Sequence, residues 1–177
     1  MNRCKWCNES NPLYVKYHDE EWGVKRFDDE YLFEMLLLEG FQAGLSWECV
    51  LNKRESFRLA FDGFNRRAIA CYDAARLGEL AENKAIIRNK RKILAASVNA
   101  RIYGDIVSEL GSFLNYLRTF WNGETIFDSK SVTSPLSDAI SKDLSSRGMK
   151  FVGSTIIHSY LQAIGIVNAH EEDCFLS

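Results

Sequence analysis

Residues that interrupt helices are scarce in this chain, and their scarcity limits the possible folds more than any other feature. Only 2 of the 177 residues are proline and 11 are glycine, well below the combined share of about 12% in average proteins. A β-sandwich or barrel needs many such residues at its turns, whereas helices need few. The composition is otherwise that of a globular protein, with 46% hydrophobic and 26% charged residues. We therefore expect an all-α fold.

Apolar residues recur at helical spacing in several segments, some of which follow a residue that can cap a helix. The expected helices begin at Asp28 or Asp29, at Ser46, near Asp73, at about Arg88, after Asp105 and after Ser137, and the last spans about 154–167. The fourth carries an apolar stripe of Ile87, Leu94, Val98 and Ile102. Residues 148–153 suit a short extended segment. No repeat or linker interrupts the series, so we expect two helical lobes with a cleft between them.

The cysteines do not fit a secreted protein. Their number is odd and their spacing irregular, unlike a disulfide framework; they are Cys4, Cys7, Cys49, Cys71 and Cys174. The N-terminus lacks the apolar run of a signal peptide, and no stretch approaches the roughly 18 apolar residues of a membrane span. We expect a cytoplasmic protein without a membrane partner. There, clustered cysteine and histidine indicate metal or redox chemistry more often than cross-links.

Potential metal ligands lie at both ends of the chain. Cys4 and His18 are near the N-terminus, and His170 and Cys174 are four residues apart near the C-terminus, so one helical turn can present the latter two to one point. Two thiolates and two imidazoles would form a closed tetrahedral zinc site. Cys7 competes, because Cys4-x-x-Cys7 is itself a ligand spacing. Spacing alone leaves open whether these residues bind zinc or are unrelated polar residues.

Glu39 is a charged residue in an apolar segment. Its neighbours one helical turn before and after it are Met35, Leu36, Gln42 and Ala43. A buried carboxylate must be hydrogen-bonded or neutralised, and such groups are common at functional sites. The alternative is a glutamate at a helix end that faces solvent past Gly40.

Aromatic residues are dense around these segments; they are Trp6, Tyr14, Tyr17, Trp22 and Trp47. Flat π faces can stack on a nucleobase. For any one of these residues alone, packing in the core is the commoner explanation.

Positive charge is concentrated in residues 84–101, which contain six basic residues and no acidic one. The whole chain has a net charge of −2, so the remainder carries −8. Lys84, Arg88, Arg91 and Lys92 fall on one helical face that can meet phosphates, although a solvated face is the commoner meaning of such a run. The short turn before this helix can aim backbone N–H groups at a phosphate.

Several motifs together resemble those of the 3-methyladenine-DNA glycosylase I family, helix-hairpin-helix enzymes of DNA repair. The matching stretches are 14–23, 38–47, 86–90, 147–155 and 165–170. The resemblance covers nearly the whole chain and implies a single glycosylase domain over residues 1–177, with the hairpin at about 83–88.

The resemblance also implies roles for individual residues. A structural zinc ion, held by Cys4, His18, His170 and Cys174, would tie the termini together and leave Cys7 as a bystander. Glu39 would recognise the base and be the catalytic residue, with Tyr17 as its hydrogen-bonding partner. The other residues of the base pocket would be Trp6, Tyr14 and Trp47. Those that contact DNA would be Gln42, Gly44 and Leu45, at the gap left by the flipped nucleotide, and Lys84, Arg88 and Lys90.

The activity implied by the resemblance is hydrolysis of the N-glycosidic bond of 3-methyladenine in double-stranded DNA by a monomeric enzyme. The base must first be flipped out of the helix. The superfamily's usual aspartate after the hairpin is missing from this family, and Asp105, roughly at that position, is better explained as a helix cap. No lysine is placed for a Schiff base, so we expect no strand cleavage.

Two other functions compete with this interpretation. One is a non-catalytic, zinc-stapled module that binds DNA lesions. It is favoured weakly by Ala85, which stands in the hairpin where the family usually has glycine, because alanine reaches positive φ only at a cost. The other is a zinc hydrolase with an open site of Cys4, Cys7 and His18.

Overall fold

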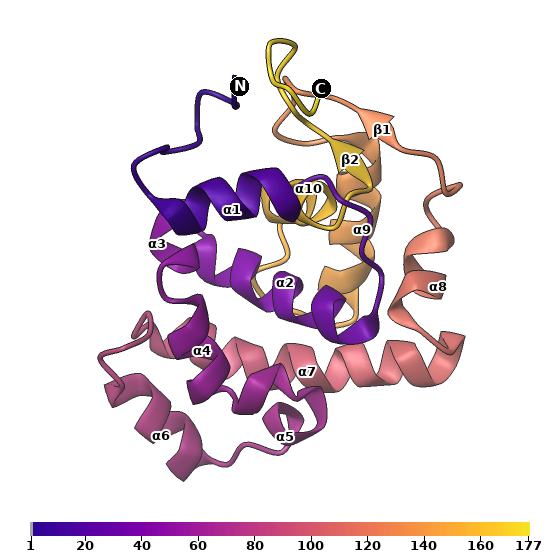
Figure 1. Cartoon of the computed structure of the whole chain (residues 1–177). Helices are drawn as coiled ribbons and strands as arrows, with labels where there is room; N and C mark the ends of the chain where they lie inside the picture. Colours follow the sequence, from indigo (N-terminus) through magenta and orange to yellow (C-terminus); the bar gives the residue numbers. More distant parts are fainter. Residues whose placement is uncertain (1) are drawn as a thin grey trace.

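Helices dominate the computed structural model, which describes residues 2–177 (Figure 1). Their bounds are α1 Pro12–Glu20, α2 Asp29–Gln42, α3 Trp47–Leu51, α4 Arg54–Ala60, η1 Asp62–Phe64, α5 Arg66–Ala70, α6 Ala74–Glu82, α7 Lys90–Leu110, α8 Phe113–Arg118, α9 Pro135–Ser146 and α10 Ser154–Ala163. Two short strands, β1 (Ile126–Phe127) and β2 (Val167–Asn168), form a parallel pair. The all-α prediction is therefore correct except for this pair.

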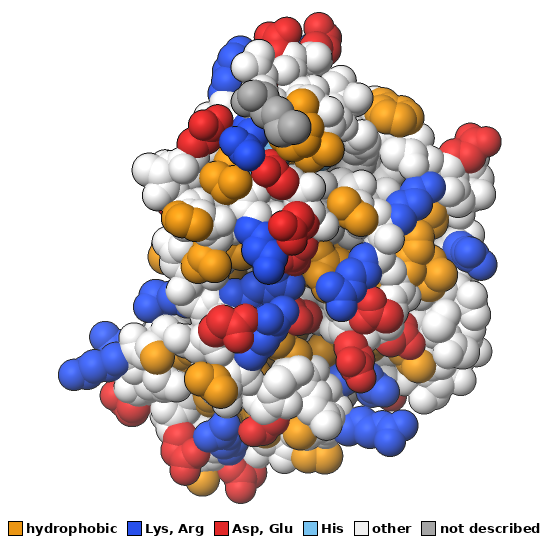
Figure 2. All heavy atoms as spheres, in the orientation of Figure 1, with side chains coloured by type: hydrophobic (Ala, Val, Ile, Leu, Met, Phe, Trp, Pro, Cys, Tyr) orange, Lys and Arg blue, Asp and Glu red, His pale blue; other side chains and the backbone are white. Residues whose placement is uncertain are grey.

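Two groups of helices pack on opposite sides of α2 (Figure 1). Helix α10 contacts α2 from the side of α1 and α9, and α7 contacts it from the side of α4, α5 and α6. On the face shown in Figure 2, acidic and basic side chains are intermixed rather than gathered by sign. No helix within the described residues has the length and apolar character needed to cross a membrane.

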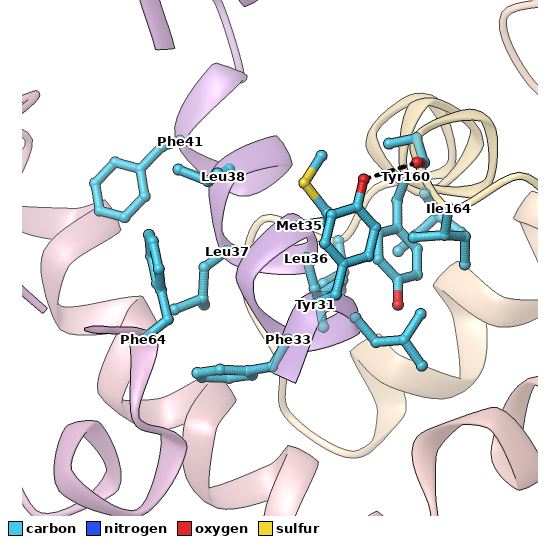
Figure 3. Packing of buried hydrophobic residues seen from close by; sticks show 14 of the residues in the cluster. Tyr31, Phe33, Met35, Leu36, Leu37, Leu38, Phe41, Phe64, Tyr160 and Ile164 are labelled. Carbon is cyan, nitrogen blue, oxygen red and sulfur yellow. Dashed lines mark hydrogen bonds between the residues drawn. The ribbon is translucent and has the colours of Figure 1, made fainter. Parts of the chain in front are cut away.

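Helix α2 is buried on all sides. Asp28 caps it by accepting a hydrogen bond from the Tyr31 N–H at 2.9 Å, and every residue from 31 to 41 is buried. Figure 3 shows Phe41 and Leu37 directed towards Phe64, whereas Tyr31 lies beside Tyr160 on the other side. A helix that is apolar all round belongs at the centre of a core. Its two charged residues in this stretch are therefore buried as well.

The sequence predicts the start of a helix well where a capping residue precedes it. Asp28, Ser46 and Asp73 each accept a hydrogen bond from a backbone N–H of the helix that follows. The expected start of α9 after Ser137 is wrong, because Ser134 is the cap and Pro135 the first helical residue. Proline suits this first position because its missing N–H would have no partner there.

The long helix α7 differs from expectation in length and orientation. It continues through Asp105, which is exposed inside the helix, so neither a helix start nor a cap lies there. Leu94, expected on the buried stripe, is 55% exposed. The buried face instead runs through residues that include Ile93, Ala96, Ala100, Tyr103 and Ile106. Small alanines let the neighbouring helices approach closely, and a pattern built on large apolar residues misses them.

Other boundaries were also wrong. The helix expected from Ser46 through Phe61 breaks into α3 and α4, and α1 and α5 were not expected. Residues 148–153 form no strand. Helix α10 ends at Ala163 rather than near residue 167, because Gly165 takes a φ of +77° and redirects the chain into β2.

Gly165 supports a testable prediction about the fold. Its φ is +77°, and an added Cβ would overlap backbone atoms of Val24 and Lys25; Gly63 has a φ of +66° with no atom within 4 Å of such a Cβ. Gly63→Ala should therefore lower the free energy of unfolding by about 1 kcal/mol, from the left-handed backbone alone. Gly165→Ala should cost about 3 kcal/mol or more, because overlap adds to that strain. Urea unfolding measures both, and equal losses would contradict the close approach.

Candidate active site and metal centre

Four side chains from the two ends of the chain converge. Cys4, His18, His170 and Cys174 are all buried, and one ligand atom from each lies within 4.8 Å of the others. The distance from His170 Nδ1 to each of the two sulfurs is 3.5 Å, as is that from His18 Nε2 to Cys174 Sγ. The structure thus brings together all four residues that the sequence identified, in an arrangement that could hold a metal ion.

Each histidine is oriented by its other nitrogen. His18 Nδ1 lies 2.8 Å from Asp19 Oδ1, and its Nε2 accepts the Cys4 N–H at 3.2 Å. His170 Nε2 lies 3.3 Å from the backbone carbonyl of Trp22. These contacts favour the tautomers with the protons on His18 Nδ1 and His170 Nε2, which is the arrangement that metal-binding histidines require. At His18 a metal ion would replace the Cys4 N–H as the partner of Nε2.

Both thiols of the cluster are buried. Burial raises the pKa of Cys4 to about 12, so the thiolate that a metal needs is unstable there without a compensating cation. Burial also lowers the pKa of His170, which favours its neutral form. A bound cation would neutralise the thiolates, and neutral imidazoles are the form that binds metals.

Hydrogen bonds between the termini support the cluster. Phe175 N–H donates to Asn2 O at 2.9 Å, and Glu171 N–H donates to Cys4 Sγ at 3.4 Å. The helical turn expected to carry both His170 and Cys174 is not formed, because the segment around them is irregular. Cys7 is buried outside the cluster. The open site of Cys4, Cys7 and His18 required by the hydrolase hypothesis is therefore contradicted.

A pocket of about 280 Å³ lies next to this cluster. It is lined by Trp6, Tyr14, Tyr17, Trp22, Glu39, Gln42, Trp47, Ser129, Ser159, Gln162, Ala169 and Glu171. These residues come from α1, the loop after it, α2, α3, α10, both terminal segments and the loop before α9. The pocket is therefore assembled from segments that are far apart in the sequence, and the expected cleft between two lobes stays a prediction.

The sequence identified the aromatic residues of this lining together with Glu39 and Gln42. It missed Ser129, Ser159, Gln162, Ala169 and Glu171. Ser159 and Gln162 are three residues apart on α10 and reach the pocket only because that helix packs beside α2. Nothing in their local sequence marks them. Glu171 could have been suspected, because it follows the candidate ligand His170.

Glu39 is the most unusual group in the pocket. It is 3% exposed, and its Oε2 has no hydrogen-bond partner among the described residues. Burial raises its pKa to about 8. Glu34, on the same helix, is instead paired with Arg54 at 2.6 Å and Arg58 at 2.9 Å. Glu39 is thus a buried carboxyl without a cation, and the alternative of a solvent-facing glutamate is wrong.

Tyr17 lies near Glu39 without a hydrogen bond between them in this structure. Burial, and secondarily the charge of Glu39, raise the pKa of Tyr17. Its ring centroid lies 5.1 Å from that of Trp47, whose buried Nε1 also lacks a partner within residues 2–177. The hydrogen bond implied by the resemblance is therefore not formed here.

The aromatic wall of the pocket continues into the metal centre. The Trp6 ring centroid lies 5.2 Å from that of Tyr14, 5.2 Å from that of His18 and 4.7 Å from that of Trp22. Trp22 in turn lies 4.6 Å from the His170 ring. Several π faces and one unpaired carboxyl suit a flat, cationic, heteroaromatic ligand.

A tight turn lies at the edge of the pocket. Leu45 N–H donates to Gln42 O at 2.6 Å, Ala43 has φ −45° and ψ 114°, and Gly44 has φ +78°. These values define a type II β-turn, which requires glycine at the third position. Gln42 lines the pocket, whereas Leu45 is 42% exposed.

The segment between α6 and α7 presents part of the expected basic face. Lys84, Arg88 and Lys90 are exposed, but Lys92 is buried and points inward, so its place on that face was predicted wrongly. Ala85 does not have a positive φ. Among the described residues other than glycine, those that do are Asp62, Phe64 and Phe151. Alanine at this position therefore causes no left-handed strain.

Comparison with known proteins identifies the family. A family model described as "Methyladenine glycosylase" matches residues 6–177. DNA-3-methyladenine glycosylase 1 of Escherichia coli K12 is 41% identical, over 98% of this chain and 96% of the relative. A crystal structure of 3-methyladenine DNA glycosylase I has a TM-score of 0.93 at 42% identity and covers 98% of each chain.

A second solved structure is equally similar in fold although its sequence is less similar. The structure described as the basis of 3-methyladenine recognition by the Staphylococcus aureus enzyme also has a TM-score of 0.93, at 32% identity. The match covers 99% of this chain and 96% of that one. From its sequence match, helical fold and pocket, the chain belongs to the methyladenine glycosylase family.

Proposed function

We propose that this protein removes 3-methyladenine from alkylated double-stranded DNA by hydrolysing the N-glycosidic bond, without cutting the strand. The main support for this proposal is the environment of Glu39. Its carboxyl is buried in an aromatic pocket and has no cationic partner among the described residues. Its relatives are named for this activity. A nucleotide in a duplex must be flipped out, at a cost of a few kcal/mol, before its base can enter such a pocket.

Charge explains how the pocket would select its base. Methylation at N3 makes adenine in DNA cationic, and this cation would provide the charge that Glu39 lacks. Glu39 accepts hydrogen bonds from the edge of the base while Trp6 and Trp47 stack on its faces. A neutral, normal adenine brings no charge that could compensate a buried carboxylate, so Glu39 would stay protonated beside it and offer no ionic attraction. The charge of the methylated base therefore favours its binding over that of undamaged adenine.

The chemistry requires little from the protein beyond this stabilisation. A cationic base is already a good leaving group, so water attacks the sugar C1′ as the bond breaks. Glu39 binds the cationic base before cleavage. The electron pair of the broken bond then neutralises the departing base, so no general acid is needed, and the attacking water releases its proton to solvent. No lysine lines the pocket, which supports base release without a Schiff base and hence without strand cleavage.

DNA would be held at two places by a monomeric, single-domain enzyme. The turn with Gln42, Gly44 and Leu45 lies at the pocket edge, where exposed Leu45 would occupy the gap left by the flipped nucleotide. Residues 83–88 would be the hairpin of a helix-hairpin-helix motif, with Lys84, Arg88 and Lys90 facing phosphates. Unstrained Ala85 removes the one feature that favoured a non-catalytic module.

Zinc is the metal that fits the terminal cluster best. With Zn–S of about 2.3 Å and Zn–N of about 2.0–2.1 Å, a tetrahedral site separates sulfur from nitrogen by about 3.5 Å. Three sulfur–nitrogen distances in the cluster are 3.5 Å. Four protein ligands leave no position for a reactive water, so the ion would be structural. It would tie the termini together and hold the aromatic wall of the pocket.

Glu39→Gln tests the assigned role of the carboxylate. The amide keeps the size of the side chain but cannot carry the negative charge, so single-turnover release of 3-methyladenine from methylated DNA should fall on the order of 100-fold. Glu30→Gln, an exposed change on the same helix, is the matched control and should leave the rate unchanged. Chromatography of released bases measures both, and an unchanged rate in Glu39→Gln would refute the role.

The same variant should be more stable than the parent protein. Burial raises the pKa of Glu39 from 4.5 to about 8, so the native state favours the protonated carboxyl. That contribution to stability is complete below about pH 4.5 and is lost as pH rises towards 8. Glu39→Gln should therefore gain on the order of 2 kcal/mol at about pH 8 and little at about pH 5. Lower stability of the variant at pH 8 would contradict the burial argument.

Metal analysis tests the zinc proposal. The purified protein should contain about one equivalent of zinc, and Cys174→Ser should lose it together with thermal stability, because a tetrahedral site with three ligands binds far more weakly. Cys71→Ser, at an exposed cysteine outside the cluster, serves as the control and should retain the metal. Absence of zinc, with normal folding of Cys174→Ser, would overturn the proposal.

A further inference from the structure

Lys92 is a buried cation that the proposed mechanism does not use. It is 6% exposed and forms no ion pair within residues 2–177. Its Nζ donates hydrogen bonds to the backbone carbonyls of Phe41 at 2.8 Å and Ala43 at 2.6 Å. The same nitrogen lies 5.8 Å from the ring centroid of Phe151. A buried ammonium group is costly unless its environment compensates it, so these contacts require an explanation.

The carbonyls that Lys92 binds are at the C-terminal end of α2. The last carbonyls of a helix have no partner within it, and the helix dipole places negative charge there. Helix α2 has no basic residue in its own last turn. Lys92 supplies that charge from α7. Since Glu39 lies in this last turn, Lys92 closes the helix end that carries the proposed base-recognition carboxyl.

Lys92 also determines the geometry of the turn that follows. Type I and type II turns differ mainly by rotation of their central peptide, which here joins Ala43 to Gly44. The carbonyl of that peptide is the Ala43 oxygen that Lys92 binds. Rotation to the other turn type would carry the oxygen away from Nζ. The lysine thus favours the type II form over the alternative.

The position of Lys92 in α7 connects this turn with the proposed hairpin. Asn89 caps α7 by accepting hydrogen bonds from the N–H groups of Arg91 and Lys92. Further along the helix, Asn99 exchanges two hydrogen bonds with the backbone of Lys150. The first turn of α7 is thus capped from the basic segment and joined through Lys92 to the turn at the pocket edge.

We propose that Lys92 is a positioning residue for excision, which locks the turn 42–45 so that pocket-lining Gln42 and exposed Leu45 meet flipped DNA in one geometry. It does not line the pocket and touches no reacting atom. The proposal rests on the proposed function, because it assumes that this turn faces DNA.

Lys92→Met tests the proposal, since methionine keeps an apolar side chain of similar length but removes the donor and the charge. Base release from methylated DNA should fall on the order of 10–100-fold in kcat/KM, as expected for misplaced binding groups. Affinity for free 3-methyladenine should change less than about threefold, because the pocket stays intact. Lys142→Met removes an exposed lysine on α9 and should change neither quantity.

A second variant isolates the turn. An alanine Cβ at Gly44 meets no atom within 4 Å, but the φ of +78° is strained for alanine. Gly44→Ala should therefore show the same split between DNA and free base. Because both changes act on one turn, the double variant should lose less activity than the product of the single losses. Amide exchange of Leu45, whose N–H closes the turn, should accelerate in all three variants.

The results of these experiments distinguish a failure of the role proposed for Lys92 from a failure of the proposed function. If the parent protein releases no 3-methyladenine, the proposed function fails. If it does, equal losses of free-base affinity and excision in Lys92→Met, or independent effects in the double variant, overturn the role of Lys92 alone. Should Lys92→Met not fold, nuclear magnetic resonance of the parent protein decides. A slowly exchanging Lys92 ammonium close to the Gly44 amide is expected, and its absence would refute the proposal.

Discussion

The burial of one uncompensated carboxyl is the constraint on which the rest of this structure depends. Glu39 lies in α2, a helix surrounded by the core, and lacks the arginine partners that neutralise Glu34 five residues earlier. A buried carboxyl without a partner raises the free energy of the ligand-free protein, and binding of a cation in the pocket removes this cost. The surrounding core must hold α2 rigidly enough to keep water away from the carboxyl.

The pocket wall needs a different kind of support, because it is assembled from opposite ends of the chain. Trp6 comes from the first residues and Ala169 and Glu171 from the last. Ordering two terminal segments costs conformational entropy that their few contacts would not offset. A metal ion held by two residues from each end would supply the missing free energy. The packing of Trp6 and Trp22 against the histidines would transmit that order to the pocket.

Local sequence patterns are sufficient to predict some helix starts and the burial of Glu39. The helix starts expected at Asp28 or Asp29, at Ser46 and near Asp73 are confirmed, because capping depends on neighbouring residues. The burial of Glu39 followed from its apolar neighbours, although spacing alone allowed the opposite. The inward direction of Lys92 could not be predicted, because it depends on which face of α7 packs inside. That face is built largely from alanines, which a pattern of large apolar residues does not register.

Long-range features required more than local patterns. The two halves of the candidate metal cluster are more than 150 residues apart. Residue types and spacing left their joint role open, and the resemblance to a family favoured it. Ser159 and Gln162 entered the pocket lining through the packing of α10, which no local signal reveals. The effect of Ala85 on the proposed hairpin likewise depends on its backbone angle, and the observed conformation needs no glycine there.

Glu39 should be protonated in the free protein and should ionise when a cation enters the pocket. Carbon-13 nuclear magnetic resonance of labelled glutamate side chains can follow its ionisation in the free protein and with 3,9-dimethyladeninium, a permanent cation that mimics the methylated nucleoside. The account predicts a midpoint of about 8 in the free protein, and a shift of several units downward when the cation binds. An ordinary midpoint in the free protein, or one that the cation leaves unchanged, would contradict it.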